Sequence, residues 1–289
     1  MHFVKLVFHA FVIFVLLGLS AQASAQRGIF WQIEKGGSQP SYLLGTVHSD
    51  DPHIMKLPKA IKHKFTQARS FSAELKMDIL SMMQSQGAMM MSDGRKLSEI
   101  IGQRRFKQCV KLMAERGMPE MLVEQMKPWA VAAQLNLPKN QSGMFLDMML
   151  YQEASTAGKP VYGLETMEEQ MGVFDGMTEK EQIVFLEESI KHVKEVPEMI
   201  RSITRLYLAR DLDGLKSYSD RIMQRNSSQL TEIFSKRLIV DRNQRMVERM
   251  LVRLEEGNAF IAVGALHLPG EKGILHLLQN RGYRIKPIY

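Results

Sequence analysis

Strand-forming patterns lie toward the two ends of this chain, and a long helical stretch separates them. Residues 28–46 (GIFWQIEKGGSQPSYLLGT) hold two runs of alternating apolar residues around Gly36-Gly37, a pattern typical of a β-hairpin. Near the C-terminus, residues 259–266 (AFIAVGAL) are typical of a buried strand, and residues 283–288 favour a final strand. These patterns predict one sheet assembled from both ends of the chain.

Two further strands and many helices are predicted between these ends. Residues 70–75 (SFSAEL) and 161–164 (VYGL) are strand candidates, each with a glutamate at its end. Thr166 is expected to cap the helix that follows the second of them. Helical patterns dominate residues 77–150 and 178–256. We therefore predict an α+β fold, in which a central sheet built from strands at both chain ends carries a large, mostly helical insertion.

The first residues have the pattern of a secretory signal peptide. Lys5 precedes the apolar run 6–25, which ends in Ala23-Ser24-Ala25, small residues that fit a signal-peptidase site. A retained membrane anchor is the alternative, but the strongly apolar core is shorter than the ~20 residues that a spanning helix needs. We therefore expect residues 1–25 to be removed and residues 26–289 to form a single periplasmic or secreted domain with no membrane span.

The charge pattern and the cysteine count exclude several classes of function. The chain has a formal net charge of +7, but its basic residues are interspersed with acidic ones along helical stretches. This pattern is typical of a solvated helix surface and predicts no nucleic-acid binding. The single cysteine, Cys109, cannot form an internal disulfide, and its amphipathic surroundings favour a buried thiol over a catalytic nucleophile.

Methionine is unusually frequent in this sequence. The chain has 22 methionines, several of them within residues 77–91 (MDILSMMQSQGAMMM). Flexible thioether side chains fill irregular cores or line adaptable apolar grooves, which is the interpretation we favour. Copper(I) binding is the alternative, because the thioether is a soft ligand and the protein is expected to be exported.

Two of the chain's 8 histidines follow predicted strands in the pattern G-x-x-H. They are His48, after Gly45-Thr46-Val47, and His267, after Gly264-Ala265-Leu266. A histidine just beyond a strand end projects into the crevice where open sheets bind ligands, and a nearby glycine permits close backbone approach. A third match, Gly273 to His276, lies within a helical apolar pattern and is expected to be structural.

Two glutamates could complete a metal site with these histidines. Glu74 and Glu165 each end a predicted strand on an apolar approach, where an unpaired carboxylate costs several kcal/mol. Two histidines and one carboxylate leave coordination positions open for water and substrate, as expected of a catalytic divalent metal. A helix cap or a salt-bridge partner is the alternative for either glutamate taken alone.

Five segments resemble, in order, the motifs of the TraB/PrgY/GumN family, which is related to the Tiki metalloproteases. They are LLGTVHSDD (43–51), FSAELKM (71–77), VYGLETMEEQM (161–171), IVDRNQRMVERM (239–250) and the block 259–288. The resemblance covers nearly all of residues 26–289, and the last block is its most specific part. The chain departs from the family pattern in its helical middle, where the many methionines are consistent with a different substrate groove.

The resemblance implies one metal site with a set of residues around it. His48, Glu74 and His267 would bind a divalent ion, with manganese, cobalt, zinc and iron not distinguished. The matching motifs also imply catalytic roles for Glu165, Arg242 and Asn243, with Gln170 in the same motif as Glu165. Gly45, Thr46 and Gly264 would support the site.

Chemistry leaves several roles open for the polar residues around the metal. A metal-bound water that loses a proton near neutral pH would be the nucleophile. Glu165 is either the general base or a partner that orients a histidine. Arg242 stabilises an oxyanion, clamps a substrate carboxylate or forms a surface ion pair. Asn243 either donates to the same oxyanion or satisfies the backbone.

Taken together, these residues favour an exported metal-dependent hydrolase, and the resemblance to the Tiki metalloproteases implies a peptidase-like enzyme. Its partner would be a peptide or small-molecule substrate. A non-catalytic binding protein for a peptide or small ligand, built on the same fold, is the alternative. Capture of haem or iron through a histidine or tyrosine is a third interpretation. The complete set of hydrolytic groups favours the enzyme, because a binding protein has no need of metal-activated water.

The signal-peptide pattern predicts that the exported protein begins at Gln26. N-terminal sequencing of protein recovered from the periplasm or the medium should find that residue first. Recovery of the chain with Met1 in a membrane fraction would instead support the retained anchor.

Overall fold

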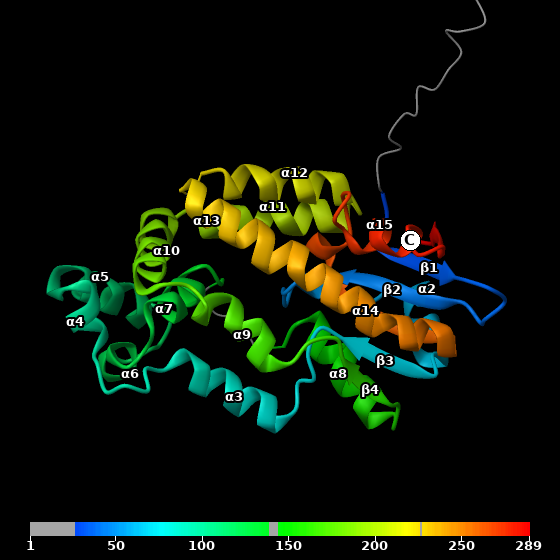
Figure 1. Cartoon of the computed structure of the whole chain (residues 1–289), viewed down its shortest axis with the longest axis horizontal. Helices are drawn as coiled ribbons and strands as arrows, with labels where there is room; N and C mark the ends of the chain where they lie inside the picture. The colour runs from blue at the N-terminus through cyan, green and yellow to red at the C-terminus, as the bar shows by residue number, and fades with distance from the viewer. Residues whose placement is uncertain (1–26, 139–143, 226) are drawn as a thin grey trace, which may run out of the picture.

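The computed structural model describes residues 27–138, 144–225 and 227–289. The predicted signal peptide, residues 1–25, lies outside these ranges, so export stays a prediction. Within the described ranges, no helix is both long enough and apolar enough to cross a membrane. The sheet lies toward one end of the molecule and a cluster of helices at the other, with further helices between them (Figure 1).

The described residues form a mixed sheet of six strands drawn from both ends of the chain. The strands are β1 (Phe30–Glu34), β2 (Ser41–Thr46), β3 (Ser70–Ala73), β4 (Val161–Gly163), β5 (Ala259–Gly264) and β6 (Arg284–Pro287). Their order is β4-β3-β5-β2-β1-β6. The first four in this order are mutually parallel, whereas β1 runs antiparallel to both β2 and β6. The predicted α+β class is confirmed.

The predicted hairpin is formed by β1 and β2, which pair in antiparallel register. Gly36 and Gly37 have φ angles of 62° and 85°, a left-handed conformation that residues with a Cβ rarely adopt. Every residue of β2 is buried, because this strand lies between β1 and β5 and both faces of the sheet are covered. The first G-x-x-H motif therefore starts from one of the most enclosed strands.

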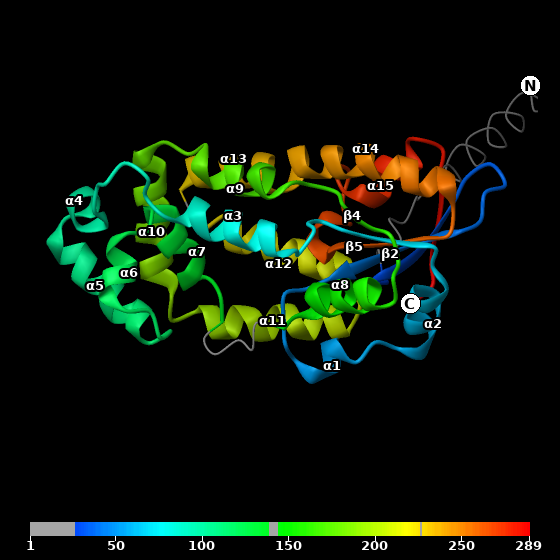
Figure 2. The ribbon, with the colours of Figure 1, turned by 90° about the horizontal axis from the view of Figure 1, so that it is seen from below.

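Helices cover both faces of the sheet. Those that pack on it or beside it are α1 (Pro52–Met55), α2 (Lys59–Gln67), α8 (Leu146–Thr156), α11 (Val196–Leu208), α12 (Leu212–Met223), α14 (Asp241–Glu256) and α15 (Ile274–Gln279). Figure 2 shows α14 and α15 on one face, and α1, α2 and α8 on the other. The core between them includes Leu43, Phe71 and Phe260, all fully buried.

The helical middle of the chain forms a second apolar core away from the sheet. Its helices are α4 (Leu97–Ile101), α5 (Gln103–Ala114), α6 (Glu120–Glu124), α7 (Pro128–Leu135) and α10 (Glu179–His192). Trp129 and Cys109 lie at the centre of this core, both almost fully buried. The indole of Trp129 donates to Asp175 at 2.8 Å, so its polar edge is satisfied at the rim. Helices α3 (Ile79–Met89) and α9 (Met167–Asp175) connect this region to the sheet.

The helical run before β5 changes its winding just before the Arg-Asn pair. Helix α13 (Ser228–Ile233) continues into a π-helical segment, η1 (Phe234–Val240), and then into α14, which contains Arg242 and Asn243. Such segments shift the side chains that follow them around the helix axis and are frequent at functional sites. The run ends at Gly257, as predicted, with a φ of 72°.

The buried Cys109 gives a test of the second core. Burial raises the pKa of its thiol to about 11, so little thiolate is present at pH 8. We expect a thiol reagent at that pH to label native protein at least ~100-fold more slowly than protein unfolded in denaturant, measured by mass spectrometry. Rapid labelling of the native protein would contradict the packing described here.

Candidate active site

The histidines and glutamates predicted from the sequence lie just beyond the carboxyl ends of the parallel strands. They are His48 after β2, His267 after β5, Glu74 after β3 and Glu165 after β4. Because β2 pairs with β5, β5 with β3 and β3 with β4, all in parallel, these ends meet at one edge of the sheet. Open sheets bind ligands at this edge.

The glycine of the first G-x-x-H motif lets the two motifs pack against each other. A Cβ at Gly45 would lie 2.8 Å from Cδ1 of Leu268 and 3.1 Å from Cα of Ala265, in the turn that follows β5. The carbonyl of Gly45 also accepts a hydrogen bond from the hydroxyl of Tyr207 at 2.8 Å. Glycine is therefore needed for the turn that carries His267 to approach β2 this closely.

Glu74 accepts hydrogen bonds from donors on three elements. Its Oε1 accepts from the backbone N–H of Gly264 at 2.6 Å, and its Oε2 accepts from Arg242 at 2.5 Å and from Gln170 at 3.3 Å. Burial by itself raises the pKa of Glu74, but His267, Arg242 and the Gly264 N–H together lower it to about 2. A Cβ at Gly264 would lie 3.2 Å from Oε1, so the second glycine leaves room for this carboxylate.

His267 is buried, and a neighbouring amide fixes its orientation. Its Nδ1 lies 2.6 Å from Oδ1 of Asn243, whose Nδ2 donates to the carbonyl of Lys272 at 2.8 Å. Because the amide nitrogen is bound to a carbonyl, the amide oxygen accepts, which assigns the imidazole proton to Nδ1. The Nε2 lone pair then faces Oε1 of Glu74, 3.7 Å away. Burial lowers the pKa of His267 to about 4, which favours the neutral imidazole that binds metals.

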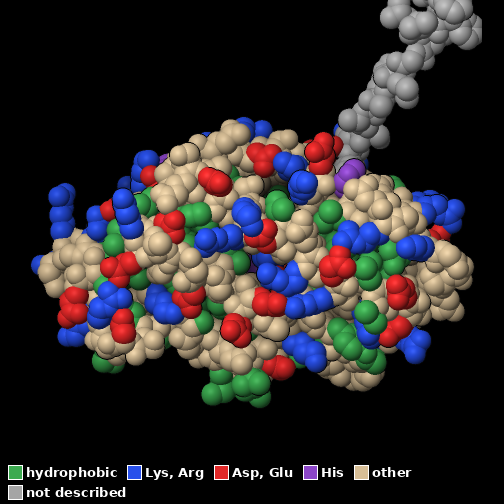
Figure 3. Space-filling view, viewed as in Figure 1, with side chains coloured by type: hydrophobic (Ala, Val, Ile, Leu, Met, Phe, Trp, Pro, Cys, Tyr) green, Lys and Arg blue, Asp and Glu red, His purple; other side chains and the backbone are tan. Residues whose placement is uncertain are grey.

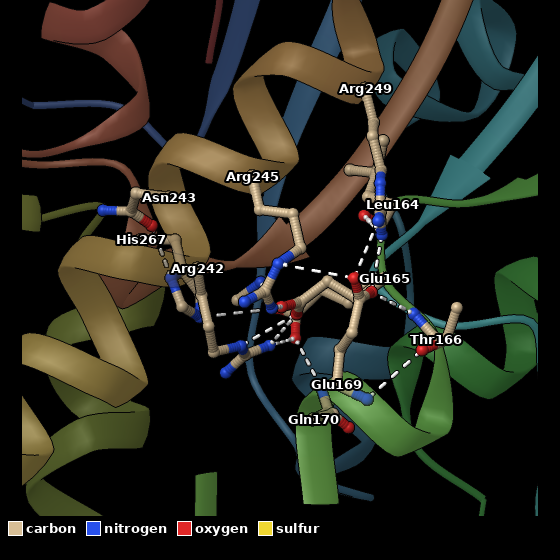
Figure 4. Close-up of polar contacts among 12 residues, drawn as sticks. Leu164, Glu165, Thr166, Glu169, Gln170, Arg242, Asn243, Arg245, Arg249 and His267 are labelled. Atoms are coloured by element: carbon tan, nitrogen blue, oxygen red, sulfur yellow. Dashed lines mark hydrogen bonds and ion pairs between the residues drawn. The ribbon is translucent and has the colours of Figure 1, made fainter. Parts of the chain in front are cut away.

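Glu165 is paired with two arginines of α14 (Figure 4). Its side chain is fully buried; Oε2 accepts from Nε of Arg242 at 2.8 Å, and Oε1 accepts from Nη1 of Arg245 at 2.8 Å. Arg242 contacts Glu74 as well, so one guanidinium joins the ends of β3 and β4. With both carboxylate oxygens bound to arginine, the geometry favours a positioning role for Glu165 over that of a general base. Arg242 is a buried bridge rather than a surface ion pair.

Both the oxygen and the nitrogen of the Asn243 amide are hydrogen-bonded. Its oxygen contacts His267 and its nitrogen donates to Lys272, so this arrangement favours orientation of the histidine over donation to an oxyanion. The sequence pattern left both kinds of role open, because it does not show which groups surround an amide in the fold.

A second pair of contacts ties α9 to α14. Thr166 caps α9 and shares a capping box with Glu169, as the sequence predicted for its start. Arg249 donates to both oxygens of Glu169, at 2.6 and 2.7 Å, and these bonds lower the pKa of Glu169 to about 2. Gln170, on the same helix, is thereby held next to Glu74.

His48 lies on the open side of the site, beside an aspartate that the sequence pattern does not single out. The imidazole is 60% exposed and packs at a tilt of 46° against Phe145, with 4.7 Å between ring centroids. Its Nε2 lies 3.8 Å from Oδ2 of Asp147. Asp147 is buried in the first turn of α8, where its Oδ1 accepts from the hydroxyl of Thr46 at 2.6 Å. Burial raises the pKa of Asp147.

One signal in the sequence could have identified this aspartate. Asp147, Leu150 and Ala154 lie at helical spacing and share the buried face of α8. A single acidic residue in such an apolar stripe needs a partner in the fold. Acidic residues are also common in the first turn of helices, so the sequence alone gives no reason to assign Asp147 to a site.

A cavity of about 370 Å³ opens beside these polar groups. His48, Glu74, Asp147 and Gln170 line it, and its apolar walls are formed by Leu75, Met77, Met82, Phe145, Met148, Met167 and Met171. Helix α3 also exposes Ile79, Leu80 and Met83, and Figure 3 shows hydrophobic side chains at this lower edge of the molecule. The methionine-rich segment therefore forms one wall of a groove next to the candidate site, consistent with the interpretation favoured above.

Two nitrogen–oxygen pairs face this edge of the sheet. They are Nε2 of His267 with Glu74, at 3.7 Å, and Nε2 of His48 with Asp147, at 3.8 Å. Across residues 27–138, 144–225 and 227–289, no group of three or more His, Cys, Asp or Glu side chains has the spacing of a formed metal site.

Comparisons with known proteins agree with the motifs at these strand ends. The profile of the TraB/PrgY/gumN family matches residues 29–287. Metalloprotease TIKI1 of Homo sapiens is 23% identical over 93% of this chain and 63% of its own length, and that of Xenopus tropicalis is 23% identical over 92% and 63%. The Danio rerio protein of the same name is 26% identical over 49% of this chain and 33% of its own. The chain thus spans less than two thirds of these curated relatives, and no solved structure matches it significantly.

The contacts of His267 predict its tautomer. In metal-free protein at neutral pH, nitrogen NMR should find the proton of His267 on Nδ1, because Asn243 accepts it there. Asn243→Ala should remove this preference and destabilise the protein by roughly 1–3 kcal/mol, since it leaves buried polar groups without partners. A proton on Nε2 in the wild-type protein would contradict the assignment.

Proposed function

Since the chain belongs to the TraB/PrgY/gumN family, we propose that it is an exported, divalent-metal-dependent hydrolase that cleaves peptides. The relatives named metalloprotease TIKI1 support the choice of reaction. The signal-peptide pattern of residues 1–25 supports export. Manganese, cobalt, zinc and iron(II) all suit a site of imidazole and carboxylate ligands.

The observation that carries the proposal is the orientation of His267 toward Glu74. The imidazole is neutral, its Nδ1 is bound to Asn243, and its Nε2 faces a carboxylate at a distance too long for a hydrogen bond. Two ligands that share one ion through bonds of about 2.1 Å lie roughly 3–4 Å apart, so the 3.7 Å spacing fits a common cation. His48 supplies a second imidazole at the same edge of the sheet.

Each polar residue has a defined task in this proposal. His48, Glu74 and His267 hold the metal, which when bound would polarise a carbonyl and make water acidic enough to act as nucleophile near neutral pH. Asn243 orients His267, and Arg242 keeps Glu74 ionised and in place. Glu165 balances the charge of Arg242. Because both oxygens of Glu165 accept hydrogen bonds from arginines, we assign it a positioning role.

The walls of the cavity suggest which substrates fit. Carboxylate and imidazole groups line the cavity together with apolar side chains, among them Met82, Met148 and Met171. A peptide bond next to a large apolar side chain would place its carbonyl at the polar groups and that side chain against the methionines. Methionine walls adapt to several apolar shapes, which favours a class of peptides over one sequence.

Peptide cleavage should require a divalent metal and the residues assigned to hold it. Purified mature protein incubated with peptides that contain apolar residues should cleave them when supplied with manganese or cobalt, and a chelator should stop the reaction. His267→Ala and Glu74→Gln should each lower kcat/KM by at least ~100-fold, because they remove a ligand. His276→Ala, which alters a histidine in α15, is the matched control and should retain activity.

Mass spectrometry of the peptide mixture distinguishes this proposal from a binding protein. Tight binding of peptides without cleavage under any of the metals, with His267→Ala still binding, would support the non-catalytic alternative. Loss of activity in well-folded His276→Ala protein would show that the wrong histidine has been assigned.

A further inference from the structure

Asp147 has a buried carboxylate oxygen whose hydrogen-bonding capacity is unused. Its Oδ1 accepts from Thr46, but Oδ2 is buried and has no hydrogen-bond partner among the described residues. Buried polar atoms are paired in the great majority of cases, so an unpaired carboxylate oxygen needs an explanation. Asp147 lines the cavity that also contains His48 and Glu74, and this oxygen lies 3.8 Å from Nε2 of His48.

The geometry at Asp147 repeats the geometry at Glu74. Oδ2 of Asp147 lies 3.8 Å from Nε2 of His48, and Oε1 of Glu74 lies 3.7 Å from Nε2 of His267. Both distances are too long for hydrogen bonds and fit two atoms that share a cation. Each imidazole after a G-x-x-H motif is thus paired with one buried carboxylate.

The two carboxylates also raise an electrostatic problem that a cation would solve. Asp147 and Glu74 line the same cavity, so two carboxylates lie near each other there. Arg242 contacts Glu74, whereas the hydroxyl of Thr46 is the hydrogen-bond donor to Asp147. A divalent ion held by both carboxylates would offset the repulsion between them.

We infer that Asp147 is a further ligand of the divalent cation, bound through Oδ2 on the same side as His48. The inference rests on the proposed function, because it concerns the metal of the same site. Thr46 holds Oδ1 and so directs Oδ2 toward the ion. The ligand set then consists of two imidazole nitrogens and two carboxylate oxygens, one pair from each G-x-x-H histidine and its neighbouring acid.

Binding of manganese to the mature protein, measured by calorimetry, tests this role without relying on catalysis. Asp147→Asn keeps an acceptor for Thr46 but removes the charged ligand, so manganese affinity should fall more than ~100-fold, beyond the 10–100-fold typical of residues outside the coordination shell. The melting temperature of the metal-free variant should equal or exceed that of the wild type, because an unpaired buried charge is gone. Asp51→Asn is the matched control, since Asp51 also pairs with a histidine but at the surface.

A thiolate at the same position provides a second, direct measurement. Asp147→Cys loaded with cobalt(II) should show a sulfur-to-cobalt charge-transfer band in the near ultraviolet, whereas the wild type should not, because Cys109 lies buried in the other core. A folded Asp147→Cys protein that binds cobalt without this band would overturn the inference.

The remaining outcomes separate this inference from the proposed function. If the wild type binds manganese and Asp147→Asn binds it with less than a 10-fold change, Asp147 is not a ligand and the proposed hydrolase stands. A lower metal-free melting temperature for Asp147→Asn with unchanged affinity would assign Asp147 a structural role and also overturn the inference. If the wild type takes up neither manganese nor cobalt, both proposals fail.

Discussion

The buried charge of Arg242 is the constraint on which the candidate site depends. Its side chain is 8% exposed, and it contacts Glu74 and Glu165, which are 15% and 0% exposed. Removing one partner from a buried ion pair leaves an uncompensated charge, which typically costs about 3–5 kcal/mol. The three side chains must therefore assemble together, and their assembly fixes α14 against the ends of β3 and β4. Arg245 adds a second contact to Glu165, so the position of the helix does not depend on one side chain.

The glycines of the two G-x-x-H motifs serve this assembly in different ways. Gly45 lets the turn after β5 pack against β2, whereas Gly264 leaves space for Oε1 of Glu74 and donates its N–H to it. The glycine of each G-x-x-H motif thus allows other groups to approach the backbone closely. The histidines of the two motifs differ accordingly, because His267 is enclosed by neighbouring groups and His48 remains 60% exposed.

Much of the fold could be predicted because its signals are local. Apolar alternation, the Gly36-Gly37 turn and the Thr166 cap each depend on a few neighbouring residues, and all three appear in the structure. The roles of the charged residues could not be predicted in the same way, because their partners are distant. Arg242 and Glu165 are 77 positions apart, and nothing near either residue shows that they meet. The sequence therefore indicated the histidines and glutamates at the sheet edge, but neither Asp147 nor which of these residues contact one another.

The site has two halves: Glu74 with His267, which neighbouring groups hold in place, and His48 with Asp147, which have fewer hydrogen bonds. Glu74 and His267 are held by Arg242, Asn243 and a backbone N–H, so their orientation does not require a metal. In the other half, His48 is exposed and Asp147 has an oxygen without a hydrogen-bond partner among the described residues. Under the proposed function, Glu74 and His267 would hold a divalent cation at little conformational cost, because both side chains are already oriented. His48 and Asp147 line the cavity beside this pair, where a peptide would bind.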